Sequence, residues 1–372
     1  MMQMLAVLIG AATVGGLPDS YFERVALALE ACHADIPAMR GPAETAAALL
    51  ADGDKLWIAG QPSMISELTG RAGGFMMARG LPETPAAEND VVLYFIEPDA
   101  AIPARSALGG YVVFFGGEAG DAPCFRHHAA ACGISPTLAN AIPGWIFTGE
   151  LIAALTRIGK MPVIYESIGM YDGHARMQQY KNGEIAFHDD LTVPPVAHGV
   201  TGSRFVDTIT AMLRRVAREE AADLERAGAW AREARAAGKR VVMYSMGHLF
   251  PDEVGKTAIG EVFHSDVWNA GFRRHPKPDD PFGPGDCIVL IGYQHAPDVL
   301  LARARPAGAR VAYVTVHPHR DYMNDPEVVW IDPMWEWRDA CVPIEGYDVP
   351  LLAPSGIVNG AIAWEIHRLA TR

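Results

Sequence analysis

The chain has 372 residues, half of them hydrophobic, which is enough for two domains that each bury a core. Its 44 acidic and 31 basic residues give a formal net charge of -13, so we expect binding neither to nucleic acid nor to an acidic membrane. The five cysteines are widely spread and form no Cys-x-x-Cys pair, which favours a cytoplasmic protein without a disulfide framework.

Residues 4–16 form an almost wholly apolar run with the length of a signal-peptide core. No basic residue precedes this run, because the first one is Arg24, and no Ala-x-Ala cleavage site follows it. We therefore expect an N-terminal helix or strand packed on a cytoplasmic protein, with export as the alternative if residues 1–17 are a leader. No other run is expected to be long enough to cross a bilayer.

Helices and short apolar strands alternate over residues 1–167, which we predict to form the first lobe. The predicted helices cover 19–50, 64–77 and 143–158, and the predicted strands cover 56–59, 91–96, 111–115 and 162–166. Alternation of this kind predicts a parallel sheet that is covered on both faces.

Residues 168–204 interrupt the alternation, since they are polar, rich in His and Gly, and contain Pro194-Pro195. We interpret them as the connection between two lobes, with a small hairpin near Asn182-Gly183. Residues 205–372 then form the second predicted lobe. A helix is expected over 205–237, strands over 241–244, 288–291 and 311–316, and further helices from about 252, 297 and 355.

The second lobe repeats blocks of the first lobe in the same order. The echoed blocks are Gly53 to Gly60 with Glu67 and Gly238 to Ser245 with Glu253; Asp90 and Asp286 with their following strands; Ala104-Arg105 and Ala302-Arg303; Gly109-Gly110-Tyr111 and Gly308-Ala309-Arg310; and Asn140 with Trp145 and Asn359 with Trp364. This pattern predicts an internal repeat and two similar lobes related by a pseudo-twofold axis. A small ligand is then expected between the lobes or at the edge of either sheet.

The order of elements resembles that of the sugar isomerase (SIS) phosphosugar-binding proteins, whose α/β lobes are flavodoxin-like, doubly wound parallel sheets. Ser66-Glu67-Leu68-Thr69-Gly70-Arg71 is similar to the Glu-Leu-Thr-Gly-Arg stretch of sedoheptulose-7-phosphate isomerases. The resemblance implies that Glu67 is a catalytic acid/base and that Arg71 contacts the substrate. The alternative is a helical surface ion pair between the two side chains.

Two further parts of the second lobe carry the resemblance. Asn359 and His367 lie eight positions apart on the last predicted helix, as do a Gln and a catalytic His in that family. Glu253 is the repeat counterpart of Glu67, and Lys256 stands near the place of Arg71. We therefore keep Glu253 as an alternative catalytic residue beside Glu67 and His367.

The turns after the strands differ from the Ser/Thr-rich phosphate turns of the family. In the first lobe Pro62 removes an amide donor, and Glu97 and Asp99 repel a phosphate. The corresponding second-lobe turns are neutral and rich in donors, so we expect the second lobe to bind the ligand more strongly. The candidate substrate-binding residues are Ser63, Arg71, Ser245, Gly247, His248, Lys256, Tyr293, Gln294, His295 and Asn359.

These residues predict a sugar or sugar-phosphate binding protein, most simply an aldose-ketose isomerase that uses Glu and His as acid/base groups. The alternative is a non-catalytic sugar-binding protein with degenerate phosphate turns. A third hypothesis is metal-assisted hydrolysis at His317 and His319, although no His-Glu-x-x-His motif is present. We expect no cofactor, no bound metal and a homo-oligomer, such as a dimer.

Overall fold

The computed structural model describes residues 17–97, 99–117, 121–245, 248–249, 253–265, 282–292, 298–316 and 320–372. Among these residues the chain forms two compact units. Unit 1 contains residues 17–19, 23–210 and 338–354, and unit 2 contains residues 20–22, 211–337 and 355–372. The division differs from the predicted ranges, because residues 168–204 pack in unit 1 instead of forming a separate connection. The predicted leader lies outside the described residues except for Leu17.

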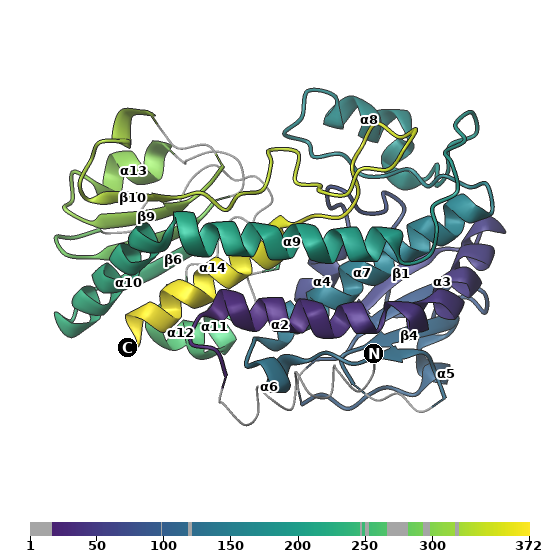
Figure 1. The fold of residues 1–372 in the computed structure, drawn as a ribbon, viewed down its shortest axis with the longest axis horizontal. Coiled ribbons are helices and arrows are strands. Elements are labelled where there is room, and N and C mark those ends of the chain that lie inside the picture. Colours follow the sequence, from purple (N-terminus) through teal and green to yellow (C-terminus); the bar gives the residue numbers. More distant parts are fainter. Residues whose placement is uncertain are drawn as a thin grey trace. The chain divides into compact units, whose positions relative to one another are not determined.

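Unit 1 is built on a five-stranded sheet in which every pair of neighbouring strands is parallel (Figure 1). Its strands are β1 (Leu56–Gly60), β2 (Arg79–Gly80), β3 (Val91–Phe95), β4 (Tyr111–Phe115) and β5 (Cys124–Phe125). Their order, β2-β1-β3-β4-β5, is that of a flavodoxin-like sheet. The central strands are apolar runs because helices and loops cover both faces.

The helices of unit 1 surround its sheet, and the longest of them, α7, is buried. They are α2 (Tyr21–Ala34), α3 (Ile36–Ala51), α4 (Pro62–Leu68), α5 (Arg105–Leu108), α6 (Ala129–Cys132), α7 (Pro136–Arg157), α8 (Gly173–Gln179), the 3-10 turn η1 (Lys181–Gly183) and the first half of α9 (Val200–Glu219), whose residues from 211 on belong to unit 2. By length and composition α7 is long and apolar enough to cross a membrane, in contrast to the expectation that no such run follows the N-terminus. Its apolar stretch is wholly buried, because α7 packs against α3 and the sheet.

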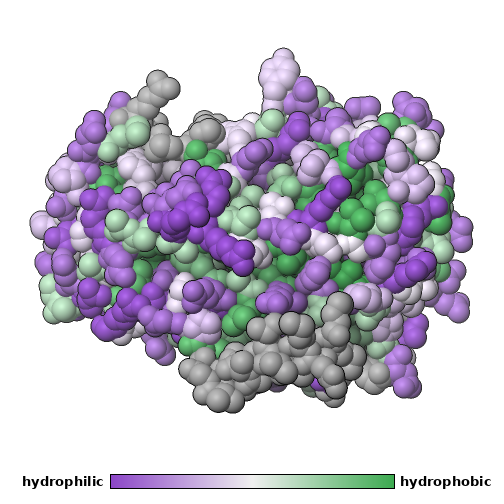
Figure 2. Space-filling model, in the orientation of Figure 1, coloured by the Kyte–Doolittle hydropathy of each residue, from purple (hydrophilic) through white to green (hydrophobic). Residues whose placement is uncertain are grey.

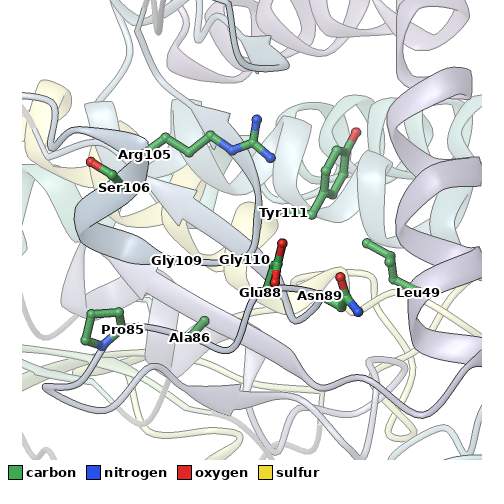
Figure 3. Close-up of a pocket in the computed structure, with 10 residues that line it drawn as sticks. All are labelled: Leu49, Pro85, Ala86, Glu88, Asn89, Arg105, Ser106, Gly109, Gly110 and Tyr111. Atoms are coloured by element: carbon green, nitrogen blue, oxygen red, sulfur yellow. The ribbon is translucent and has the colours of Figure 1, made fainter.

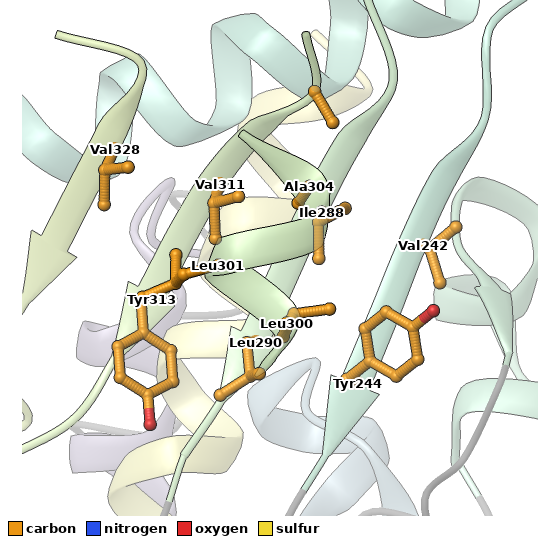
Figure 4. Close-up of a cluster of buried hydrophobic side chains, with 11 residues drawn as sticks. Val242, Tyr244, Ile288, Leu290, Leu300, Leu301, Ala304, Val311, Tyr313 and Val328 are labelled. Atoms are coloured by element: carbon orange, nitrogen blue, oxygen red, sulfur yellow. The ribbon is translucent and has the colours of Figure 1, made fainter. Parts of the chain in front are cut away.

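Unit 2 contains a second all-parallel sheet with the same strand order. Its strands are β6 (Val241–Ser245), β7 (His264–Ser265), β8 (Cys287–Ile291), β9 (Arg310–Val314) and β10 (Val328–Ile331), in the order β7-β6-β8-β9-β10. Its helices are α10 (Ala221–Ala236), α11 (Glu253–Lys256), α12 (Ala258–Val262), α13 (Asp298–Ala304), the 3-10 turn η2 (Arg320–Tyr322) and α14 (Ser355–Ala370). Figure 4 shows how α13 buries Leu300 and Leu301 against one face of this sheet.

The same turn precedes β3 in unit 1 and β8 in unit 2. In each unit the aspartate directly before this strand accepts two backbone N–H groups. One belongs to the residue before β1 or β6, and the other belongs to the residue three positions before the aspartate. The bonds are Lys55 N to Asp90 Oδ1 (2.9 Å), Ala87 N to Asp90 Oδ2 (3.2 Å), Arg240 N to Asp286 Oδ1 (3.1 Å) and Gly283 N to Asp286 Oδ2 (2.9 Å). The predicted blocks therefore occupy equivalent places. Their origin by duplication and the pseudo-twofold axis stay predictions.

Helix α9 is amphipathic, as expected for a helix that covers a core. Phe205, Ile209 and Leu213 are buried on one side, whereas Arg214 and Arg218 are exposed on the other. Figure 2 shows hydrophilic residues interspersed with hydrophobic ones over this helix.

Three predicted elements differ in the structure. Residues 162–166 do not join the sheet and form only isolated bridges, Phe75 with Ile164 and Pro162 with Phe187. The predicted helix over 64–77 ends at Leu68, and the predicted hairpin near Asn182 is the 3-10 turn η1.

Residues 338–354, which we name the strap, follow strand β10 of unit 2 but belong to unit 1. Leu352 N donates to Gly73 O at 2.9 Å. Tyr347 Oη accepts Ile164 N at 3.1 Å, and Arg338 Nη2 lies 3.1 Å from Glu166 Oε1. The strap thus contacts Gly73 and residues 162–166, the segment that was predicted to be a strand.

Candidate functional site

The carboxyl ends of β1 and β3 are tied to α7 by buried side-chain amides. Gln61 Nε2 donates to Thr137 Oγ1 at 2.7 Å. Asn140 Nδ2 donates to Gln61 Oε1 at 2.9 Å and to Ile96 O at 3.0 Å. In open parallel sheets ligands bind outside the carboxyl ends of the strands, so this edge is where the fold favours a site.

The carbonyl oxygen of Asn140 is buried and has no hydrogen-bond donor among the described residues. Its orientation is fixed, because Ile96 O can only accept and must therefore face the amide nitrogen. Gly116 leaves room beside this oxygen, since a Cβ at that glycine would lie 2.7 Å from Asn140 Oδ1. A buried acceptor without a donor costs about 1–3 kcal/mol, so this position favours a donor from beyond the described residues, such as a ligand.

The corresponding asparagine of unit 2 is satisfied by the chain itself. Asn359 Nδ2 donates to Gly292 O at 3.5 Å, and Gly292 follows β8 as Ile96 follows β3. Asn359 Oδ1 accepts Trp335 Nε1 at 3.0 Å. In unit 2 the indole N–H of Trp335 therefore supplies the donor that Asn140 Oδ1 lacks among the described residues of unit 1.

His127 lies beside the open acceptor of unit 1. Its Cδ2 would be 3.2 Å from a Cβ at Gly116, on the same side as Asn140 Oδ1. Ala129 N donates to His127 Nδ1 at 3.3 Å, which places the proton of the neutral ring on Nε2. Burial lowers the pKa of His127, so the imidazole is neutral at pH 7 and offers an N–H donor.

Glu67, the predicted acid/base, is enclosed in the interior of unit 1. It is 0% exposed and accepts Trp145 Nε1 at 3.0 Å. Arg71 Nε lies 3.7 Å from Glu67 Oε2, and Arg71 Nη2 lies 3.2 Å from Asp339 Oδ2 of the strap. Burial raises the pKa of Glu67. These contacts connect α4, α7 and the strap, and the catalytic role of Glu67 stays a prediction.

Unit 2 repeats the carboxylate-indole pair. Trp364 Nε1 donates to Glu253 Oε2 at 2.8 Å, as Trp145 does to Glu67. The His367 ring packs edge-on against Trp364 with centroids 5.3 Å apart, and its Nε2 lies 2.9 Å from Ala258 O. Two predicted catalytic residues of unit 2, Glu253 and His367, thus contact one indole. Burial lowers the pKa of His367.

The predicted substrate-binding residues are only partly described. The hydroxyls of Ser63 and Ser245 are buried and have no partner among the described residues. His248 follows β6, and Lys256 ends α11. Gly247, Tyr293, Gln294 and His295 lie outside the described residues, so the expected preference for the second lobe stays a prediction.

Metal-ligating side chains do not gather in the described part of the chain, where no group of three His, Cys, Asp or Glu could hold an ion. His317 and His319, which suggested a metal site, lie outside the described residues. In unit 1, Glu97 and Asp99 are exposed at the carboxyl end of β3, where the sequence predicted an acidic turn.

Sequence reasoning did not select Gln61 or His127 as site residues, and it used Asn140 only as a marker of the repeat. The position of Gln61 in the first predicted turn was a usable signal. The contribution of His127 depends on β5 and the turn before α6, which no periodicity indicates.

Each unit has an SIS-like fold, since both sheets have the flavodoxin-like strand order expected of the predicted lobes. The chain is similar over 94% of its length to the C-terminal domain of glucosamine-fructose-6-phosphate aminotransferase from Francisella tularensis, of which it covers 96%, with a TM-score of 0.51 and 10% sequence identity. At this identity the similarity shows the fold, and the predicted fold class is confirmed.

Two other solved structures also match 94% of the chain. One is a candidate sugar-binding protein from Salmonella typhimurium LT2, with a TM-score of 0.47, 11% identity and 98% of that chain covered. The other is a candidate phosphosugar isomerase from Silicibacter pomeroyi DSS-3, with a TM-score of 0.43, 11% identity and 97% of that chain covered. No family model and no curated protein matches the sequence.

Proposed function

We propose that the protein binds a sugar or sugar phosphate at the carboxyl edge of the unit 1 sheet. The observation that carries the proposal is the buried carbonyl oxygen of Asn140, which has no donor among the described residues. Sugars are rich in hydroxyl donors, and one hydroxyl would satisfy this oxygen. The SIS-like fold supports the same ligand class by analogy.

The charges at this edge favour contact with the sugar end of the ligand. His127 offers an N–H to a sugar oxygen, whereas Glu97 and Asp99 are acidic. Two carboxylates close to a phosphate dianion would cost several kcal/mol, roughly as Coulomb's law gives at a protein surface. The ligand is therefore a free sugar, or a sugar phosphate whose phosphate points away from this turn.

The enclosed carboxylates favour binding without catalysis. Glu67 and Glu253 each accept an indole N–H, and their side chains are buried. A general base must lie within hydrogen-bond distance of the substrate. A buried carboxylate that already accepts an indole N–H reaches the substrate only after a rearrangement. We therefore propose a sugar-binding or sugar-sensing role as the primary function.

A matched pair of serine variants tests the proposal. Free fructose and fructose 6-phosphate are titrated calorimetrically into the wild type, Ser63→Ala, Ser245→Ala and His127→Gln. Both serine hydroxyls are buried and have no partner in the described part of the chain, so alanine should leave the folded state intact. We expect weaker binding in Ser63→Ala and His127→Gln only. Loss of binding in Ser245→Ala alone would favour the second-lobe site, and no binding of either sugar would refute the proposal.

Isomerase chemistry is the second candidate, favoured by the contact of Glu253 and His367 with one indole. An isomerase moves a proton between neighbouring carbons, so it exchanges that proton with solvent. Proton NMR of fructose 6-phosphate in D2O with the purified protein measures this exchange. If exchange occurs, Glu67→Gln and Glu253→Gln identify the base, because loss of a general base lowers turnover by about 10²- to 10⁴-fold. If neither exchange nor an aldose product appears above a protein-free control, isomerisation of fructose 6-phosphate is refuted.

The remaining predictions are a cytoplasmic location and a homo-oligomer, which we keep as proposals. Size-exclusion chromatography with light scattering measures the second directly.

A further inference from the structure

Unit 1 has a hollow at the opposite edge of its sheet, where β3 and β4 begin. It has a volume of about 760 Å3 and is lined by Leu49, Pro85, Ala86, Glu88, Asn89, Arg105, Ser106, Gly109, Gly110 and Tyr111 (Figure 3). Its floor is backbone, because a Cβ on Gly109 would lie 2.2 Å from Ala86 O and one on Gly110 would lie 2.3 Å from Asp90 O. The repeated aspartate turn fixes this floor in place.

The equivalent position of the chain in unit 2 carries an aromatic ring. The aspartate turns align Ala87 with Gly283, so Phe282 stands where unit 1 has Ala86. Both residues pack against the cluster on the same face of their sheets. The Arg303 guanidinium lies over the Phe282 ring at 5.5 Å from its centroid.

Unit 1 keeps the cation but not the ring. Arg105, which the sequence repeat aligns with Arg303, lines the hollow and makes no ion pair with the described residues. In unit 2 the counterpart of Tyr111 is Arg310, which is held by Glu233 and Glu327. Unit 1 therefore has an open space and an available guanidinium where unit 2 has an internal stack.

We propose that this hollow binds a flat heteroaromatic ring of the nucleobase class, in the place that Phe282 fills in unit 2. The Arg105 guanidinium would lie over the face of the ligand ring, as Arg303 lies over Phe282. A hollow of about 760 Å3 is in the range of small-ligand sites and accommodates a nucleoside.

The polar side chains around the hollow select the ligand further. Asn89 can pair with a base edge through both its amide N–H and its carbonyl oxygen, as asparagine does with adenine. Glu88 makes no ion pair with the described residues and accepts N–H groups. The same carboxylate disfavours a phosphate nearby, so the ligand is a neutral base or nucleoside with an exocyclic amine. The polar ends of Glu88, Arg105 and Tyr111 are drawn in Figure 3.

Adenosine is the probe for this proposal, with inosine and ribose as matched ligands. We expect adenosine to bind with a Kd on the order of 0.1–1 mM, which is ordinary for an exposed site and a ligand of this size. Inosine, which lacks the exocyclic amine, should bind more weakly, and ribose should leave the hollow empty. Arg105→Ala should weaken adenosine binding by about 2- to 5-fold, the value of an exposed cation-π contact.

The decisive variant is Ala86→Phe, which supplies the ring of unit 2. We expect it to abolish adenosine binding and to raise Tm by about 1–3 °C, because it fills the hollow beneath Arg105. Ala87→Phe adds the same ring one residue away, outside the lining of the hollow, and should leave adenosine binding unchanged. Ser63→Ala should also leave it unchanged, which separates this site from the proposed sugar site.

Three results would overturn the proposal. They are no saturable adenosine binding up to about 5 mM, equal affinity for adenosine in Ala86→Phe and the wild type, or equal affinity for adenosine and ribose. The first limit follows from the expected Kd.

Discussion

The repeated carboxylate-indole pair predicts different losses of stability in the two units. Trp145→Phe and Trp364→Phe each remove the N–H that Glu67 or Glu253 accepts, at 3.0 Å and 2.8 Å respectively. Both carboxylates are buried, so each variant leaves a buried acceptor with one donor fewer. The two variants differ in the space they leave, because Trp145 is 0% exposed whereas Trp364 is partly exposed.

The magnitudes follow from these contacts. Loss of a hydrogen bond to a charged group costs about 1.5–3 kcal/mol. The smaller ring of phenylalanine adds a cavity in the core at Trp145, at a cost of about 1–2 kcal/mol. We therefore expect the free energy of unfolding to fall by about 3–5 kcal/mol in Trp145→Phe and by about 1.5–3 kcal/mol in Trp364→Phe.

Urea unfolding followed by far-ultraviolet circular dichroism measures both losses without relying on tryptophan emission. Trp330→Phe is the control, because Trp330 donates at 3.4 Å to the uncharged Tyr322 O, and it should cost about 1 kcal/mol. A cost below about 1 kcal/mol for Trp145→Phe would refute the reasoning, as would a larger cost for Trp364→Phe than for Trp145→Phe.

Two titratable groups give predictions about pH. Burial, together with the negative charge of Asp223, raises the pKa of Glu220 to about 6, so the folded state loses stability as the pH rises through 6. Glu220→Gln should be more stable than the wild type at pH 8 by about 1 kcal/mol or less, since the group is half-exposed, and equal to it at pH 4.5; a constant difference would contradict this. Burial, with the charge of Arg176, lowers the pKa of His188, so the folded state loses stability as the pH falls below 6.5. His188→Gln should lose less stability than the wild type in thermal unfolding between pH 7.5 and 5.5, and parallel losses would refute the assignment.

The central strands and the fold class could be predicted because their signal is local. β3 and β8 are uninterrupted apolar runs that follow an aspartate, and such runs are typical of strands covered on both faces. The edge strands β2, β5 and β7 have two residues each, too few for any periodicity. Their pairing depends on loops that the sequence pattern does not position.

The start of α7 was misplaced because two prolines compete for it. The prediction began at Pro143, since proline is favoured in the first turn of a helix. The structure begins the helix at Pro136, where Ser135 Oγ accepts Leu138 N at 3.2 Å and caps it. Pro143 lies inside the helix, where packing in the core offsets the missing N–H.

The motif around Glu67 identified a residue that matters to the structure but could not give its surroundings. The i,i+4 spacing predicted the approach of Arg71, whereas Asp339 reaches the same guanidinium from the strap. Asn140 stood out as part of the repeat, yet its open carbonyl oxygen depends on Gln61 and Ile96. Contacts between residues distant in the chain, such as these, cannot be predicted from the local pattern of one sequence.

The strap has a consequence for how the protein is made. Arg71 cannot meet Asp339, and the carbonyl of Gly73 cannot accept Leu352 N, until a ribosome has translated nearly the whole chain. A product that stops at residue 210 would retain the unit 1 sheet but lack these partners, so we expect it to be protease-sensitive. Unit 1 thus draws part of its packing from a segment that lies after the last strand of unit 2 in the chain.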